Sequence, residues 1–138
     1  MVKSIVKDKE VLTQKSEKFV FGEDEQVIQD LIDTANEYKY QCAGLAAIQI
    51  GIPKKVIVIN HQGKYIPYIN PSIIYRSKQT YMIEERCLSV EGAHNVKRHK
   101  IIKLMWTTEK GKVMCKEIHG YLAQVLQHEC DHLNGVLI

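Results

Sequence analysis

The sequence predicts an α+β fold in which most strands pair antiparallel. Three observations lead to this class: one segment has helical periodicity, several β-branched runs follow it, and a second helical segment ends the chain. The chain has 138 residues, of which 45% are hydrophobic and 25% are charged, as in an ordinary globular protein. We therefore expect a single domain over residues 1–138 with a core of its own.

The acidic stretch Glu23-Asp24-Glu25 is expected to form the first turn of the first helix, because negative charges stabilise that turn. Apolar residues then recur at helical spacing as far as about Tyr40, namely Val27, Ile28, Leu31, Ile32, Ala35 and Tyr38. This spacing predicts an amphipathic helix with one buried face.

Strands are expected in the middle of the chain. Residues 55–60 contain the run Val-Ile-Val-Ile, which is typical of a buried strand. Weaker patterns predict strands over residues 65–70, 73–76 and 101–107. Residues 109–111 separate residues 101–108 from 112–118, which favours a hairpin with Gly111 at positive φ in its turn.

The last segment returns to helical spacing. Its apolar residues and one carboxylate share a face: Leu122, Val125, Leu126, Glu129 and Leu133. Asn134-Gly135 is a typical helix stop. Because residues 121–126 are apolar on several sides, we expect this helix to be largely buried.

Composition and charge exclude several classes of protein. The net charge is only +3, from 19 basic and 16 acidic residues. The sequence has no long basic tract, so it does not favour nucleic-acid binding. No apolar stretch approaches the roughly 18 residues of a membrane helix, and residues 1–4 lack the apolar run of a signal peptide. We expect a soluble, cytoplasmic protein without a membrane partner. In that setting, four cysteines without a CxxC pair indicate buried thiols or metal ligands.

The C-terminal helix carries the pattern H-E-x-x-H at residues 128–132. Positions i and i+4 lie on one face, so His128 and His132 can reach one cation. Glu129 is offset by about 100°, close enough to touch a water on that metal without ligating the ion. The alternative is a charged turn facing solvent, but polar groups on a buried helix are costly unless they are paired or ligated. The pattern therefore predicts a metal site.

A catalytic metal needs three protein ligands and an open position. The candidates for the third ligand are the four cysteines, the other four histidines and the remaining carboxylates, and spacing alone does not choose among them.

Three blocks together resemble the peptide deformylase family. Residues 42–49 (C-A-G-L-A-A-I-Q) are similar to the family block G-x-G-Φ-A-A-x-Q, residues 85–89 (E-R-C-L-S) to E-G-C-L-S, and residues 128–132 (H-E-C-D-H) to H-E-x-D-H. The blocks occur in the family order, and the resemblance extends over nearly the whole chain. It implies a deformylase-like fold, with antiparallel strands packed around a central C-terminal helix.

The resemblance also implies an activity: hydrolysis of the N-formyl group of the formyl-methionine that begins nascent polypeptides. By similarity, Cys87, His128 and His132 bind Fe²⁺, which Zn²⁺, Ni²⁺ or Co²⁺ can replace. Glu129 would accept the proton of the attacking water and pass it to the leaving amine.

Further site residues follow from the same resemblance. The side-chain amide of Gln49 and the backbone N–H of Leu88 would hold the developing oxyanion. Asp131, paired with Arg98, would support the helix from behind the ligands. The residues expected to contact substrate are Gly44, Leu45 and Arg86. The expected partner is a formylmethionyl peptide, bound by a monomer.

The sequence departs from the family pattern at two glycines, where it has Cys42 and Arg86. Arg86 adds a long cationic side chain at the rim of the expected cleft, pointing either into the cleft or to solvent. The chain also ends six residues after His132, before the C-terminal extension of many bacterial members, so a ribosome contact cannot be carried over.

Three alternatives remain at this point: a divergent relative with weak or altered deacylase activity, a non-enzymatic metal-binding module, and an unrelated metallopeptidase. Glu129 and Gln49 argue against the non-enzymatic module, because a structural site has no use for a water-activating carboxylate. A structural zinc site would also normally have a fourth protein ligand.

Overall fold

The computed structural model describes residues 1–138 and has the predicted α+β class. The helices are α1 (Lys9–Leu12), α2 (Glu25–Glu37), the 3₁₀ turn η1 (Ala47–Ile50) and α3 (Gly120–Leu133). The strands are β1 (Gly44–Ala46), β2 (Val56–His61), β3 (Lys64–Arg76), β4 (Thr80–Cys87), β5 (Val90–His99), β6 (Ile101–Thr107) and β7 (Val113–His119). None of the helices has both the length and the apolar character that crossing a membrane would require.

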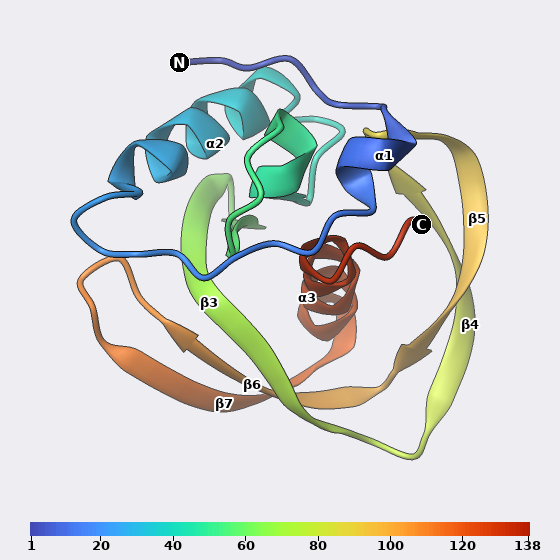
Figure 1. Cartoon of the computed structure of the whole chain (residues 1–138). Helices are drawn as coiled ribbons and strands as arrows, with labels where there is room; N and C mark the ends of the chain where they lie inside the picture. Colours follow the sequence, from blue (N-terminus) through green and yellow to red (C-terminus); the bar gives the residue numbers. More distant parts are fainter.

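All named strands pair antiparallel, in two sheets. The larger sheet has the order β1-β2-β3-β6-β7, and the smaller consists of β4 and β5. Figure 1 shows α3 in the middle of the molecule, with β3, β6 and β7 on one side and the β4–β5 pair on another. The expectation of antiparallel strands around a central C-terminal helix is therefore confirmed.

Strand β2 separates two apolar clusters, because alternate side chains of a strand point to opposite faces. Val56 and Val58 pack in the cluster that includes α2, whereas Ile57 and Ile59 pack in the cluster that includes α3. All four side chains are at most 1% exposed. Burial on both faces explains why this strand is a continuous β-branched run, and it fixes α3 against the larger sheet.

The structure changes several predicted boundaries. The strands expected over residues 65–70 and 73–76 are one strand, β3, whose pairing with β6 shifts register between Ile69 and Ser72. At this irregularity Asn70 has φ +49°, and its side-chain amide bonds the backbone N–H and C=O of Phe19. The prediction of two strands was wrong because a bulge bends a strand without ending it.

The two predicted helices are present, but α2 ends at Glu37, three residues before the expected end. The hairpin between β6 and β7 has Gly111 at φ +85°, as predicted. Five short or polar elements were not predicted: α1, β1, η1, β4 and β5.

Candidate metal and catalytic site

The two histidines of the H-E-C-D-H segment lie on one buried face of α3. His128 is 8% exposed and His132 is fully buried. Their Nε2 atoms are 3.3 Å apart, and the rings meet edge to face with centroids separated by 5.0 Å. The helical spacing therefore directs two nitrogen donors toward a single point.

The last residue of β4 completes this group. Cys87 Sγ lies 3.4 Å from His132 Nε2, and the three ligand atoms of Cys87, His128 and His132 all lie within 4.8 Å of one another. A tetrahedral ion bonded at about 2.0–2.3 Å to such nitrogen and sulfur atoms would separate them by roughly 3.3–3.6 Å. The spacing and the chemistry of these donors therefore fit a divalent metal ion.

Behind the histidines, Glu85 holds His128 in position. Its Oε1 is 2.7 Å from His128 Nδ1, and both of its oxygens accept hydrogen bonds from Arg98, at 3.0 Å from Nε and 2.7 Å from Nη2. Arg98 also donates from Nη1 to Asp131, at 2.6 Å. Burial alone would raise the pKa of Glu85, but these hydrogen bonds hold it at about 2. The carboxylate therefore remains charged.

Glu129 lies next to the two histidines and is 4% exposed. Burial raises its pKa to about 7, and its Oε1 has no hydrogen-bond partner in the protein. Gly44 packs directly against it: a Cβ at position 44 would come within 3.1 Å of Glu129 Cγ and 2.9 Å of Ile59 Cδ1. Any side chain at Gly44 would therefore displace Glu129 or the core.

The side chain of Gln49, in η1, is fixed at both ends. Its Oε1 accepts from the backbone N–H of Ala46 at 3.0 Å. Its Nε2 lies 3.1 Å from Ser89 Oγ and 3.3 Å from Cys87 Sγ. The amide group thus reaches the sulfur of the candidate metal ligand with a defined orientation.

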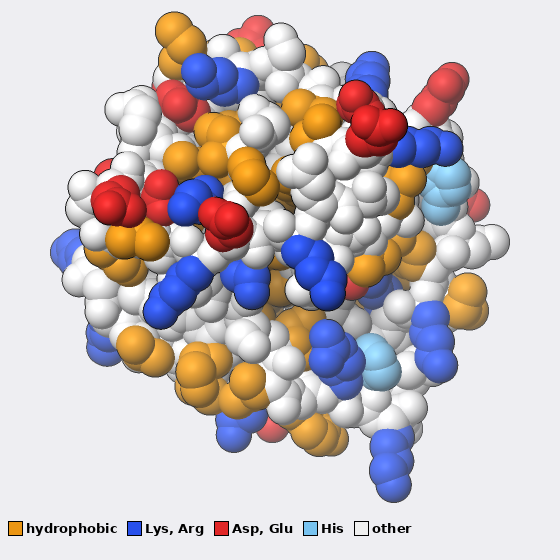
Figure 2. All heavy atoms as spheres, viewed as in Figure 1, with side chains coloured by type: hydrophobic (Ala, Val, Ile, Leu, Met, Phe, Trp, Pro, Cys, Tyr) orange, Lys and Arg blue, Asp and Glu red, His pale blue; other side chains and the backbone are white.

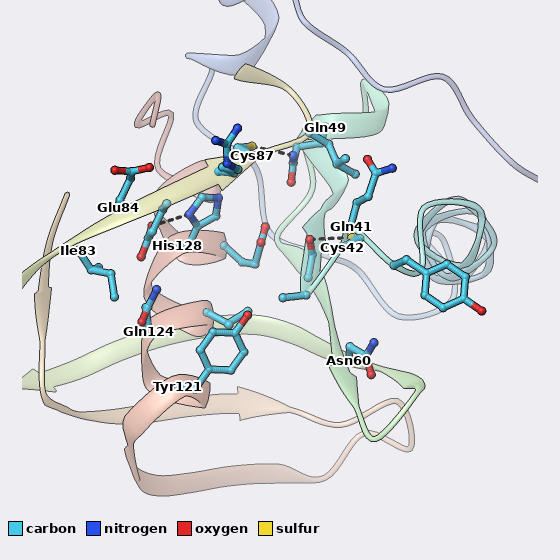
Figure 3. Close-up of a pocket in the computed structure, with 18 of the residues that line it drawn as sticks. Gln41, Cys42, Gln49, Asn60, Ile83, Glu84, Cys87, Tyr121, Gln124 and His128 are labelled. Carbon is cyan, nitrogen blue, oxygen red and sulfur yellow. Dashed lines mark hydrogen bonds and ion pairs between the residues drawn. The ribbon is translucent and has the colours of Figure 1, made fainter. Parts of the chain in front are cut away.

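These groups open onto a cavity of about 750 Å³. Figure 3 shows that the side chains of Gln49, Cys87 and His128 converge, while Tyr121, Gln124 and Ile83 lie further along the cavity. Four other predicted site residues also line it, namely Gly44, Arg86, Leu88 and Glu129. A cleft of this size can hold several residues of a peptide.

Four predicted site residues do not line this cavity. Leu45 is fully buried in the core cluster that includes α2, so the structure does not bring its side chain to a substrate. His132, Arg98 and Asp131 do not line the cavity: His132 contacts Cys87, and Arg98 bonds Asp131.

Both departures from the expected glycine pattern occur at the cavity. Arg86 is exposed on β4 and makes no ion pair with Glu84 or another residue. Cys42 is 5% exposed, and its Sγ is 3.1 Å from the carbonyl oxygen of Gly44. Burial raises the pKa of the Cys42 thiol to about 12, which disfavours a reactive thiolate.

Sequence reasoning did not assign roles to Glu85 or Ser89. Both lie in the E-R-C-L-S block, and the alternation of a strand could have identified Glu85, because it must share an inward face with Cys87. Ser89 is 5% exposed and gave no comparable signal.

Comparisons with known proteins agree with this geometry. The polypeptide deformylase family model matches residues 2–138. Peptide deformylase from Clostridium beijerinckii is 38% identical over 138 residues, which cover 100% of both chains. The crystal structure of peptide deformylase from Thermotoga maritima superposes with a TM-score of 0.89 at 33% identity, over 99% of this chain and 95% of that one. A Met-Ala-Ser-bound class I type b peptide deformylase from Acinetobacter baumannii gives a TM-score of 0.89 at 27% identity, over 99% and 97%.

Proposed function

The chain belongs to the peptide deformylase family, and on that premise we propose that its cavity beside α3 removes the N-formyl group from formylmethionyl peptides. One observation carries the proposal: Cys87, His128 and His132 meet within 4.8 Å, beside the buried carboxylate of Glu129 and at the wall of a peptide-sized cavity. We further propose that the substrates are nascent chains in the cytoplasm and that the protein acts as a monomer.

The proposed cofactor is Fe²⁺, with Zn²⁺, Ni²⁺ or Co²⁺ able to replace it. A thiolate with two imidazoles suits such first-row cations and disfavours Mg²⁺ and Ca²⁺, which prefer oxygen ligands. When bound, the ion supplies Lewis-acid activation of a water molecule. Turnover should be higher with Fe²⁺, Ni²⁺ or Co²⁺ than with Zn²⁺, and equal turnover of all four reconstituted proteins would reject the assignment.

Glu129 is the proposed proton carrier. It follows His128 directly on α3, and its Oε1 is free of protein partners, so it can accept a proton from the attacking water. The same carboxyl group then donates that proton to the amine nitrogen as the bond from the formyl carbon to that nitrogen breaks. The products are formate and a free N-terminal amine.

Gln49 and Leu88 are proposed to stabilise the oxyanion that forms on the formyl oxygen. Ala46 orients the Gln49 amide through its Oε1, which places Nε2 3.3 Å from the sulfur of the proposed ligand Cys87. An N–H of Nε2 that now faces Cys87 or Ser89 would be shared with the oxyanion. Leu88 follows Cys87 and lines the cavity, where its backbone N–H can serve as a second donor. Losing one such donor typically lowers the rate by about 10²–10³-fold.

Glu85, Arg98 and Asp131 are proposed to position the ligands. A carboxylate on Nδ1 fixes the histidine so that Nε2 presents its lone pair to the ion. Arg98 ties that carboxylate to α3 through Asp131, because it bonds both acidic side chains at 3.0 Å or less.

Substrate comparison tests this function against its alternatives. We expect the metal-loaded protein to release formate from formyl-Met-Ala-Ser and to release acetate from acetyl-Met-Ala-Ser far more slowly. Comparable turnover of the two peptides would instead favour the altered deacylase, for which the presence of Arg86 and Cys42 at the cavity is the specific argument. No turnover of either peptide by protein that holds its metal would favour a non-enzymatic module.

A further inference from the structure

A second cavity, of about 320 Å³, lies near the C-terminal end of α3, on a different side of the helix from the candidate metal site. The helix contributes Cys130 and Leu133 to this second cavity, and Asn134 follows directly after the helix, whereas His128 and Glu129 are among the helical residues that line the first cavity. At about 100° per residue, Cys130 lies roughly 200° around the helix axis from His128, so the two cavities open on different sides of α3. The remaining walls come from the N-terminal segment, the residue before β2, and β3. We call this second cavity the basic recess.

The charge of the basic recess is entirely positive. Lys18, Lys55 and Arg76 line it, and no aspartate or glutamate is among its lining residues. None of the three cations makes an ion pair, although the neighbouring Lys54 pairs with Glu17 and Asp24. Figure 2 shows Lys and Arg side chains across the centre of the face that it displays. In the same view, Figure 1 shows the N-terminal segment crossing β3 there. Three close cations without a counter-charge raise the local concentration of anions.

The backbone around the basic recess is held in place before any ligand binds. Asn70, at φ +49°, bonds the N–H and C=O of Phe19 through its side chain. Its own N–H donates to the carbonyl of Lys55 at 2.8 Å, and the Lys55 N–H donates to the carbonyl of Glu17 at 2.7 Å. These bonds tie together the segments that carry Lys18 and Lys55, so little ordering of the backbone would oppose binding.

We propose that the basic recess binds a small phosphate-bearing anion, either inorganic phosphate or a phosphomonoester. Two or three cations match the charge of a phosphate group, and the exposed hydroxyl of Ser72 adds a neutral donor. A nucleic acid fits less well, because the recess has no aromatic side chain on which a base could stack and no basic stripe leads away from it.

A bound phosphate would bridge the N-terminal segment, β3 and the last turn of α3. Because it binds only the folded protein, it stabilises that state by RT ln(1 + c/Kd), where c is the phosphate concentration. At a phosphate concentration about tenfold above Kd, the melting temperature should rise by about 3–6 °C.

The test is a titration of metal-loaded protein with inorganic phosphate, at constant ionic strength set with sodium chloride, followed by thermal unfolding. A parallel titration with glycerol phosphate distinguishes free phosphate from a phosphomonoester. The variants are Lys18→Gln and Arg76→Gln, both at exposed positions, and the control is Lys64→Gln at the other end of β3. For the wild type and Lys64→Gln we expect a melting temperature that rises with the logarithm of the phosphate concentration above Kd. For Lys18→Gln and Arg76→Gln we expect the apparent affinity to be at least fivefold weaker.

Other outcomes overturn the proposal. A rise that is linear in phosphate concentration and equal in all four proteins would mean that phosphate acts only as an excluded salt. A logarithmic rise that is equal in all four would place the anion elsewhere, such as at the catalytic metal. The cations would then serve the C-terminal end of α3. Displacement of phosphate by a single-stranded oligonucleotide that binds over tenfold more tightly would favour a nucleic-acid site. None of these results depends on deformylase activity.

Discussion

His128 Nδ1 lies 2.7 Å from Oε1 of Glu85, a buried carboxylate two residues before Cys87. Strand β4 therefore brings two groups to α3: the candidate metal ligand Cys87, and the carboxylate that orients the candidate ligand His128. Donation of the Nδ1–H to Glu85 leaves the Nε2 lone pair facing Cys87 and His132. Because Arg98 also bonds Glu85, the orientation of His128 depends on a residue that does not line the cavity.

Glu85→Gln should weaken metal binding by about 10–100-fold, because the amide keeps the shape but loses the charge that orients His128 and pairs with Arg98. The measurement is a competition titration with a chelator. Glu84→Gln is the matched control, since Glu84 is the neighbouring residue and is exposed. Equal affinities for the two variants would show that Glu85 does not position the ligand.

Glu129→Gln should retain the metal, because Glu129 is not one of the three proposed ligands, and should lose at least about 10²–10⁴-fold in turnover. Metal content and deformylation are measured on the same preparation, with His132→Ala as the comparison that loses the ion. If both variants lose metal equally, Glu129 is itself a ligand and the proposed mechanism fails.

Arg98→Met should lower the free energy of unfolding by about 3 kcal/mol, because it leaves Glu85 and Asp131 without their shared partner in a mostly buried network. Asp131 is partly exposed, which keeps the loss at the lower end of the range for broken buried pairs. Lys97→Met, at the adjacent exposed position on β5, should change stability by less than about 0.5 kcal/mol. The measurement is chemical unfolding of the two variants. Equal losses in their free energy of unfolding would contradict the account.

Much of this architecture was predictable because its apolar pattern is strong. The run 55–60 and the periodicity of residues 122–133 predicted β2 and α3, which are buried elements. The β4–β5 pair was missed because it is rich in polar and charged residues, and many of its side chains face solvent. A strand that is exposed along much of its length carries little hydrophobic signal.

The candidate site, too, was predictable only in part from local sequence patterns. The i, i+4 spacing placed His128 and His132 together from local geometry, but no local pattern could select Cys87 as their partner. Its Sγ meets His132 only because β4 ends beside α3, a contact between residues 45 apart in the chain. The choice of Cys87 depended on the resemblance of three blocks to a known family, and its role as a ligand stays a prediction.

Arg86 should favour substrates with an acidic residue at the second position and disfavour basic ones. It is an unpaired, exposed cation at the cavity, so the effect should not exceed about 1 kcal/mol, or roughly fivefold in kcat/KM. Matched formyl-Met peptides with Asp, Ser or Lys at that position are compared for the wild type and Arg86→Gly. Identical profiles for the two proteins would mean that the Arg86 side chain points away from the substrate.

The central claim is that Cys87, His128 and His132 hold the ion that deformylation requires. The most direct test is metal analysis of anaerobically purified protein coupled to a formyl-Met-Ala-Ser deformylation assay, on the wild type, Cys87→Ser and the control Cys42→Ser. We predict about one ion per chain, together with turnover, for the wild type and Cys42→Ser, and loss of both for Cys87→Ser. Full metal content and turnover in Cys87→Ser, or deformylation by metal-free wild type, would contradict the account.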